Sequence, residues 1–218
     1  MQHCIFDLDG TLFDSSNQIL NAISITRESN KLKKLSVDEI KSRIGLPATY
    51  LFEDVDESYQ TIQNLVRQFR ENLRHEIVKS NPLFPGVLNF INFLFKMNIR
   101  LSVATTKPTD LAEWTIVNSP LVDRILNIQG TDNFPAKPNP QVLINCDIRG
   151  NESNTFMFGD RVEDVHAALS ANLIAVGIAQ SVHSVDVLKN AGANFVFKSF
   201  EEFENIISTL NLTNESLY

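Results

Sequence analysis

The stretch Cys4-Ile5-Phe6-Asp7-Leu8-Asp9-Gly10-Thr11-Leu12 decides most of what the chain can be. A short apolar run followed by Asp and Gly is typical of a strand that ends at a turn. Side chains alternate between the faces of a strand, so Asp7 and Asp9 are expected to share one side at its carboxyl end. Two close carboxylates repel each other unless a cation or proton lies between them, which favours a hard metal ion such as Mg²⁺. A surface turn is the alternative explanation for this pattern taken alone.

The composition narrows the class of protein. The 218 residues, of which 43% are apolar and 15 are Phe, predict one α/β domain or one domain with a modest insertion. A net charge of −7 argues against nucleic acid or an anionic membrane as a partner. No apolar run approaches the roughly 20 residues that span a bilayer, so we expect a cytoplasmic protein. The two cysteines, Cys4 and Cys146, are expected to be buried, reduced thiols, and no pattern indicates an oligomeric state.

Residues from about 14 to 80 show only helical patterns. Asp14-Ser15-Ser16 supplies N-cap residues for a first helix, and Ser36 with Glu39 forms a capping-box signature for a second. Apolar residues at helical spacing predict a longer helix over about 57–78. We therefore expect an all-helical segment between the first strand and the rest of the chain.

The pattern changes after Gly86, where strands alternate with helices. Predicted strands at 100–104, 125–128, 155–158, 173–176 and 195–197 are separated by helices at 87–97, 109–117, 140–146, 162–171, 182–190 and 200–210. Such alternation indicates a parallel sheet, in which ligands bind beyond the carboxyl ends of the strands. The loops after residues 6, 104 and 158 should therefore converge, with the helical insertion lying over them as a lid.

Three further polar clusters follow predicted strands. Thr105-Thr106-Lys107 offers hydroxyl and backbone N–H groups before a helix, as an anion site or as an ordinary turn. Lys137 lies between Ala136 and Pro138, with a second proline at 140, and places one cation that either neutralises an anion or is simply solvated. Asp160 and Asp164 lie one helical turn apart and either cap a helix or add to the acids at this sheet edge. Four acids at one edge are hard to explain without a cation.

The clusters together carry a family resemblance. Asp7-x-Asp9-Gly10-Thr11, Thr105 after a strand, Lys137-Pro138 and Gly159-Asp160-x-x-x-Asp164 resemble, in order, the four motifs of the haloacid dehalogenase superfamily of phosphohydrolases. The neighbouring residues are most similar to its phosphoglycolate phosphatase-like branch. The resemblance implies a Rossmann-like parallel sheet as a core domain, residues 1–13 and 86–218, with an inserted all-helical cap domain, residues 14–85.

The resemblance also implies roles for the motif residues. Asp7 is the expected nucleophile, forming an aspartyl-phosphate, and Asp9 is the expected acid and base. Mg²⁺ is expected to be held by Asp7, the backbone carbonyl of Asp9 and Asp160, with Asp164 in support. The phosphoryl oxygens are expected to meet Thr105, Lys137 and backbone N–H groups near Leu8 and Thr106.

The roles of several residues in the expected insertion, and of one residue beside a motif, stay undecided between alternatives. Arg43 and Gly45 resemble the cap segment that faces the active site in this branch, and Arg43 either meets a substrate group or is an exposed helix arginine. Arg161 stands where relatives usually carry Thr or Ser, and is expected to face solvent or to pair with Glu163 or a cap acid. Arg67, Arg70 and Arg74 share a helical face, which we interpret as solvated.

The expected function is that of a Mg²⁺-dependent phosphatase acting on small phosphorylated metabolites. A phosphosugar mutase of the β-phosphoglucomutase type shares the four motifs, and a catalytically silent binding protein shares the fold. Glycolate phosphate, sugar phosphates, pyrophosphate and nucleoside monophosphates all remain open as substrates, because they depend on cap residues outside the motifs.

Overall fold

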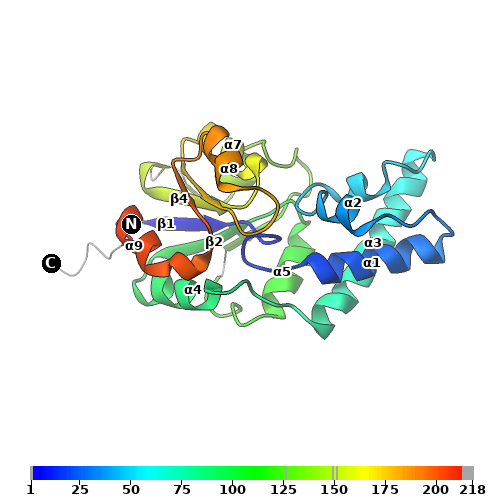
Figure 1. The fold of residues 1–218 in the computed structure, drawn as a ribbon, viewed down its shortest axis with the longest axis horizontal. Coiled ribbons are helices and arrows are strands. Elements are labelled where there is room, and N and C mark those ends of the chain that lie inside the picture. The colour runs from blue at the N-terminus through cyan, green and yellow to red at the C-terminus, as the bar shows by residue number, and fades with distance from the viewer. Residues whose placement is uncertain (1, 126, 149, 151, 213–218) are drawn as a thin grey trace.

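The fold is a parallel sheet with helices on both faces and a helical insert at one end (Figure 1). A computed structural model describes residues 2–125, 127–148, 150 and 152–212. Within these residues, no helix combines the length and apolarity that a membrane crossing requires.

All six strands of the sheet are parallel, in the order β3-β2-β1-β4-β5-β6. The central strand β1 therefore lies between β2 and β4, with Phe6 paired to Val103 and to Phe158. This topology places the ends of β1, β2 and β4 side by side, as the sequence predicted. The strands are β1 (His3–Phe6), β2 (Arg100–Ala104), β3 (Asn127–Gln129), β4 (Thr155–Gly159), β5 (Ile174–Ile178) and β6 (Phe195–Phe197).

The two faces of the sheet bury separate apolar clusters. Along β1, Cys4 and Phe6 point into one cluster and Ile5 into the other, as strand alternation requires. Phe6 stacks on Phe158 with ring centroids 4.8 Å apart, and Phe90 meets Phe158 edge-on. Apolar packing on both faces of the sheet thus holds the strand ends in place.

The helices that cover the sheet follow the expected alternation with the strands. Those on the first face are α4 (Val87–Lys96), α5 (Thr109–Val117) and α9 (Phe203–Leu210), the last preceded by the 3₁₀ turn η3 (Phe200–Glu202). Those on the opposite face are α6 (Gln141–Ile144), α7 (Val162–Ser170) and α8 (Val185–Asn190), and the 3₁₀ turn η2 (Glu152–Asn154) precedes β4.

The helical insert comprises α1 (Ser16–Ser29), α2 (Val37–Lys41), the 3₁₀ turn η1 (Ala48–Phe52) and α3 (Tyr59–Lys79). It has its own apolar cluster, which Leu111 of α5 joins from the sheet domain. At its base the outgoing and returning chains pair, with Asp14 N donating to the Pro82 carbonyl and Phe84 N to the Leu12 carbonyl. The predicted all-helical segment between β1 and β2 is thereby confirmed.

Local details differ from the sequence predictions in informative ways. The capping box of Ser36 and Glu39 is present at α2. Ser15 takes the N-cap position of α1 but makes no side-chain cap bond, because its hydroxyl donates to Asp9 instead. Strand β3 begins at Asn127, later than predicted, and residue 126 of the predicted strand lies outside the described residues. Helix α8 begins at Val185 rather than at residue 182, because Ser184 caps it.

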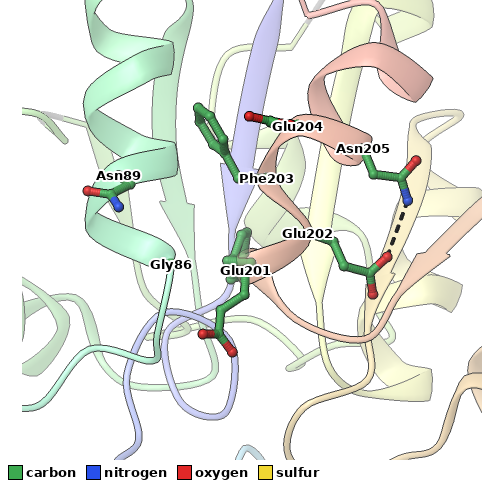
Figure 2. A pocket seen from close by; sticks show the side chains of 8 residues that line it. Gly86, Asn89, Glu201, Glu202, Phe203, Glu204 and Asn205 are labelled. Carbon is green, nitrogen blue, oxygen red and sulfur yellow. Dashed lines mark hydrogen bonds between the residues drawn. The ribbon is translucent and has the colours of Figure 1, made fainter.

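A wide hollow of about 770 Å³ lies between α4 and the η3–α9 segment (Figure 2). Its rim carries Glu201, Glu202 and Glu204, and Asn205 donates to Glu202 at 3.2 Å. It shares no residue with the loops that follow β1, β2 and β4, so the chemistry argued below lies elsewhere.

His3 on β1 makes folding sensitive to acid. Its ring shares a hydrogen bond of 2.7 Å with the Ser102 hydroxyl, and burial, with a smaller contribution from Arg100, lowers its pKa from 6.5 to about 4. Between pH 6.5 and pH 4 His3 is protonated in the unfolded chain but neutral in the folded one. Its contribution to the free energy of unfolding is therefore fully present above pH 6.5 and is lost as the pH falls toward 4. The total loss should be about 3 kcal/mol.

The prediction is checked by urea unfolding from pH 7 to pH 4. His3→Gln, which cannot titrate, should flatten the acid decline of the unfolding free energy by this amount. An identical decline in both proteins would contradict the assignment.

Candidate active site

Three buried carboxylates converge where β1 and β4 end. Asp7 follows β1, and Asp160 and Asp164 follow β4 at the start of α7. Ligand oxygens of Asp7, Asp160 and Asp164 lie within 4.8 Å of one another, and each residue is at most 3% exposed. The topology therefore brings together the acids that the sequence predicted at this edge.

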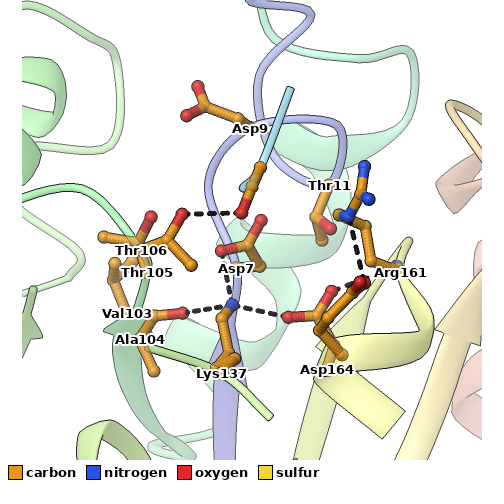
Figure 3. Close-up of polar contacts among 12 residues, drawn as sticks. Asp7, Asp9, Thr11, Val103, Ala104, Thr105, Thr106, Lys137, Arg161 and Asp164 are labelled. Atoms are coloured by element: carbon orange, nitrogen blue, oxygen red, sulfur yellow. Dashed lines mark hydrogen bonds and ion pairs between the residues drawn. The ribbon is translucent and has the colours of Figure 1, made fainter. Parts of the chain in front are cut away.

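Lys137 balances part of this charge (Figure 3). Its Nζ donates to Asp7 Oδ1 at 2.7 Å, to Asp164 Oδ1 at 2.5 Å and to the Ala104 carbonyl at 3.0 Å. Burial alone would lower its pKa, but Asp164 and Asp7 raise it above the ordinary value, so the ammonium stays charged. One lysine thus joins β2 to the acids after β1 and β4, and it is not solvated.

Lys137 neutralises only part of the negative charge of the three carboxylates. Burial, followed by repulsion from Asp164 and Asp9, raises the pKa of Asp7 to about 6 against the opposing effect of Lys137. Burial and the Asp164 and Asp7 carboxylates raise the pKa of Asp160 well above its usual range. Thr11 donates to Asp160 Oδ1 at 2.9 Å, whereas the buried Oδ2 has no hydrogen-bond partner among the described residues. A cluster of carboxylate oxygens that the lysine neutralises only in part fits a hard divalent cation such as Mg²⁺.

Gly10 permits this close packing. Its φ of +87° is a left-handed conformation, and a Cβ there would lie 2.4 Å from Asp160 Oδ2. The turn after β1 can therefore pass directly over the Asp160 carboxylate only with glycine at this position.

Asp9 faces away from the three clustered acids. Its carboxylate accepts from the Ser15 hydroxyl on one oxygen and forms an ion pair with Lys107 on the other. It lines a pocket beneath the helical insert, together with Thr106 and Lys107. The crowded pair predicted from the sequence is therefore split, with Asp7 inside the carboxylate cluster and Asp9 facing the insert.

The comparisons with known proteins bear on this arrangement. The sequence model of a protein family described as haloacid dehalogenase-like hydrolase matches residues 4–178. This range includes Lys137 and the three clustered carboxylates. The chain belongs to this family.

Relatives of this hydrolase include two phosphatases that are named for different substrates. It is 28% identical to a phosphoglycolate phosphatase from Chromobacterium violaceum, over 93% of this chain and 94% of that protein. It is 24% identical to the pyrophosphatase PpaX from Oceanobacillus iheyensis, over 93% and 95% of the two chains. A solved structure of a predicted phosphatase from Clostridium acetobutylicum superposes with a TM-score of 0.84 at 25% identity, covering 95% and 98%.

The remaining predicted site residues of the hydrolase lie on the loop after β2 and on the insert. Thr105 is buried and its hydroxyl accepts from Lys107 N at 3.3 Å. Thr106 donates its hydroxyl to the Gly45 carbonyl at 2.8 Å, across to the insert. Arg43 is not a freely exposed arginine, because it lines the pocket beside Asp9 and lies 3.9 Å from Glu53.

Arg161 pairs with Glu163, one of the two expected alternatives, and does not face solvent. It is 6% exposed, and its Nη1 donates to the Ile44 carbonyl of the insert at 2.6 Å while its Nε donates to Glu163 at 3.1 Å. Gly45 has φ of +85°, and a Cβ there would lie 2.7 Å from Arg161 Cδ, so the two residues fit only as a pair. Arg161 and Thr106 therefore hold consecutive carbonyls of the insert against the sheet domain.

Three residues of the site were missed from sequence. The sequence predicts Ser15 as a helix cap and Lys107 as part of a possible anion-site loop, but it does not predict that both side chains bind Asp9. Arg70 was assigned to a solvated face, yet it is half-buried and lines the pocket. A helical face alone does not reveal that a neighbouring domain covers it.

The bond from Arg161 to the insert predicts a measurable change in local opening. Arg161→Met keeps much of the side-chain length but removes the donor to Ile44. Since a charged donor contributes about 1.5–3 kcal/mol, hydrogen exchange of the 37–52 amides should speed up about 10- to 100-fold. Lys189→Met, at an exposed position of α8, serves as the control and should change nothing. Equal exchange in Arg161→Met and the unmodified chain would contradict the role of this bond.

Proposed function

We propose that this hydrolase is a Mg²⁺-dependent phosphatase that acts on small phosphorylated metabolites through an aspartyl-phosphate on Asp7. The observation that carries the proposal is the buried cluster of Asp7, Asp160 and Asp164 around Lys137, with one Asp160 oxygen unpartnered among the described residues. Buried charges in proteins are paired with opposite charges or coordinate metals. A phosphatase centre needs an excess of buried negative charge to hold a divalent cation.

Asp7, Asp160 and the backbone carbonyl of Asp9 are the proposed ligands of Mg²⁺, with Asp164 in support. The bound cation supplies positive charge that lets an anionic phosphate approach a carboxylate. Lys137 would contribute a second positive charge beside Asp7, because its Nζ contacts that carboxylate. Thr105 and Thr106 complete the proposed set that binds the phosphoryl oxygens, together with Lys137.

The proposed reaction divides the two aspartates. An Asp7 oxygen forms a bond to phosphorus while the bond from phosphorus to the leaving oxygen breaks, and Asp9 gives that oxygen a proton. Asp9 then takes a proton from a water whose oxygen attacks the same phosphorus, which releases phosphate and restores Asp7. The position of Asp9 at the pocket beneath the insert supports this division, because the leaving group must lie on that side.

The relatives support the substrate class. Proteins named for phosphoglycolate and for pyrophosphate both match nearly the whole chain. We retain the division into a core domain, 1–13 and 86–218, and a cap domain, 14–85, as part of the proposal, with the cap moving about its base at Phe13 and Leu83.

Phosphate release with and without a chelator tests the proposal. Glycolate phosphate and pyrophosphate should both be assayed at millimolar Mg²⁺, in excess EDTA and after Mg²⁺ is restored. We expect activity to disappear in EDTA and to return with Mg²⁺. Release that continues in EDTA would overturn the metal dependence, and isomerisation of a sugar 1-phosphate without net release would indicate a mutase instead.

A further inference from the structure

Gln180 holds the loop after β1 from a distant part of the sequence. It lies two residues beyond the end of β5, where Ala179 N still donates to the Phe197 carbonyl of β6 at 2.8 Å. Its Nε2 donates to the Thr11 carbonyl at 2.7 Å and to the Gly10 carbonyl at 3.4 Å. None of the four sequence motifs includes this residue. One side chain from the end of β5 therefore ties down the turn that follows Asp9.

Only one orientation of the Gln180 amide allows these bonds. Both partners are carbonyl oxygens, which only accept, so the amino group must face them and Oε1 must point away. Oε1 is then buried and makes no hydrogen bond among the residues that the structure describes. A buried acceptor without a donor destabilises the fold, so the favourable contribution of this amide comes from its amino group.

The turn that Gln180 holds is compact in itself. The Leu8 carbonyl accepts from Leu12 N and from Phe13 N, each at 2.9 Å, and Gly10 N donates to the Phe13 carbonyl at 3.0 Å. These bonds fix the shape of the turn, but they do not fix where it lies against the neighbouring strands. The two bonds from Gln180 supply that link, because they join the turn to the end of β5.

The same turn contacts Asp160 on its other side. The buried Thr11 hydroxyl donates to Asp160 Oδ1 at 2.9 Å, and a Cβ on Gly10 would lie 2.4 Å from Asp160 Oδ2. Asp160 is 1% exposed, so protein atoms rather than water decide how its carboxylate is oriented. A shift of the turn would therefore move the hydroxyl that orients this carboxylate.

We propose that Gln180 is a positioning residue for the metal site, holding the turn so that the Thr11 hydroxyl stays on Asp160. This inference rests on the proposed function, because it takes Asp160 as a ligand of Mg²⁺. Loss of a residue that orients a metal ligand typically weakens metal binding about 10- to 100-fold. Thr11 has that relation to Asp160, and Gln180 acts through Thr11, so the effect of Gln180 should be the smaller of the two.

Binding of Mg²⁺ to the substrate-free protein, measured by calorimetry, tests the proposal. Gln180→Met keeps much of the side-chain length and removes a neutral donor, so the Kd for Mg²⁺ should rise about 3- to 10-fold. Thr11→Val removes the hydroxyl at nearly constant size and should raise the Kd about 10- to 100-fold.

Gln18→Met is the matched control. Gln18 Nε2 also donates to a backbone carbonyl, that of Ser80 at 2.8 Å, and its Oε1 is likewise buried without a partner among the described residues. This bond lies at the base of the insert, between α1 and the end of α3. Its loss should lower the free energy of unfolding about as much as Gln180→Met does, but it should leave the Kd for Mg²⁺ unchanged. An equal rise of the Kd in both variants would overturn the proposal.

The double variant Thr11→Val with Gln180→Met tests whether Gln180 acts through Thr11. Once the hydroxyl is absent, removing the Gln180 donor should change the Kd by less than about twofold. Two losses that multiply in full would refute the proposed path.

Hydrogen exchange in the metal-free protein tests the first step of this path. Gln180→Met should speed up exchange of the amides of residues 10–13 about 3- to 10-fold, whereas Gln18→Met should not. Unchanged exchange in Gln180→Met would mean that the turn does not depend on Gln180.

The outcomes separate this inference from the proposed function. If Mg²⁺ binds Gln180→Met as tightly as the unmodified chain, the role of Gln180 is refuted, while a phosphatase that stops in EDTA still stands. If the unmodified chain binds no Mg²⁺, the metal-dependent phosphatase fails and the positioning role of Gln180 fails with it.

Discussion

Asp7→Asn is expected to lower kcat for phosphate release by about 10⁴-fold or more. The amide of asparagine is a poor nucleophile, and no other described carboxylate lies at the end of β1 in contact with Lys137 Nζ. Asparagine has nearly the same size as aspartate, so the geometry around it should persist. The measurement is single-turnover phosphate release from the best substrate at saturating Mg²⁺.

The same variant should not be less stable than the unmodified chain. Burial and neighbouring acids raise the pKa of Asp7 to about 6, so its ionised form, still the main form at pH 7, is destabilised by folding in the metal-free protein. Removing the charge relieves repulsion from Asp164 and Asp9, which offsets the weaker bond to Lys137. Loss of activity together with unchanged urea unfolding would separate catalysis from folding. Activity within tenfold of the unmodified chain would exclude Asp7 as nucleophile.

Lys137→Met should be the most damaging change to stability at the site. Lys137 Nζ contacts Asp7, Asp164 and the Ala104 carbonyl, and the side chain is 3% exposed. Removing one partner from a buried ionic group typically costs about 3–5 kcal/mol, because the remaining charges stay buried and unpaired. The activity should also fall about 10²- to 10³-fold, since a positive charge beside the phosphoryl group is lost.

Urea unfolding with and without Mg²⁺ measures this effect. Millimolar Mg²⁺ should restore part of the lost stability in Lys137→Met, because a cation bound to the folded state alone stabilises it. Lys189→Met, at an exposed position of α8, is the control and should change the free energy of unfolding by less than about 0.5 kcal/mol. A Lys137→Met variant as stable as this control would mean that the carboxylates do not depend on the lysine.

Much of the fold and of the cluster could be predicted from the sequence because both depend on strand order. Alternation of strands and helices fixes a parallel sheet, and a parallel sheet places the residues after its central strands at one edge. Asp7, Lys137, Asp160 and Asp164 therefore meet as expected. Their predicted roles stay predictions until the variants are measured.

The contacts made by residues beneath and beside the insert could not be predicted in the same way. The sequence predicts a helix cap for Ser15, a possible anion-site loop for Lys107 and a solvated face for Arg70. For Arg161 it predicts solvent exposure or the pair with Glu163 that the structure shows, but not the bond to Ile44. Local patterns describe a helix and its turns, but they do not say which part of another domain packs against them. The orientation of the insert decides these contacts, and Gly45 beside Arg161 shows how closely the two surfaces fit.

The most direct test of the proposed roles, Asp7 as nucleophile and Asp9 as acid and base, is whether Asp7 becomes phosphorylated in the Asp9→Asn variant. With p-nitrophenyl phosphate, whose leaving group needs no proton, the first step should proceed while loss of the base slows hydrolysis of the intermediate. Acid quenching followed by mass spectrometry should then find one phosphoryl group on the peptide that contains Asp7. A stoichiometric burst of p-nitrophenolate without phosphate on Asp7, or with phosphate on another residue, would contradict the account.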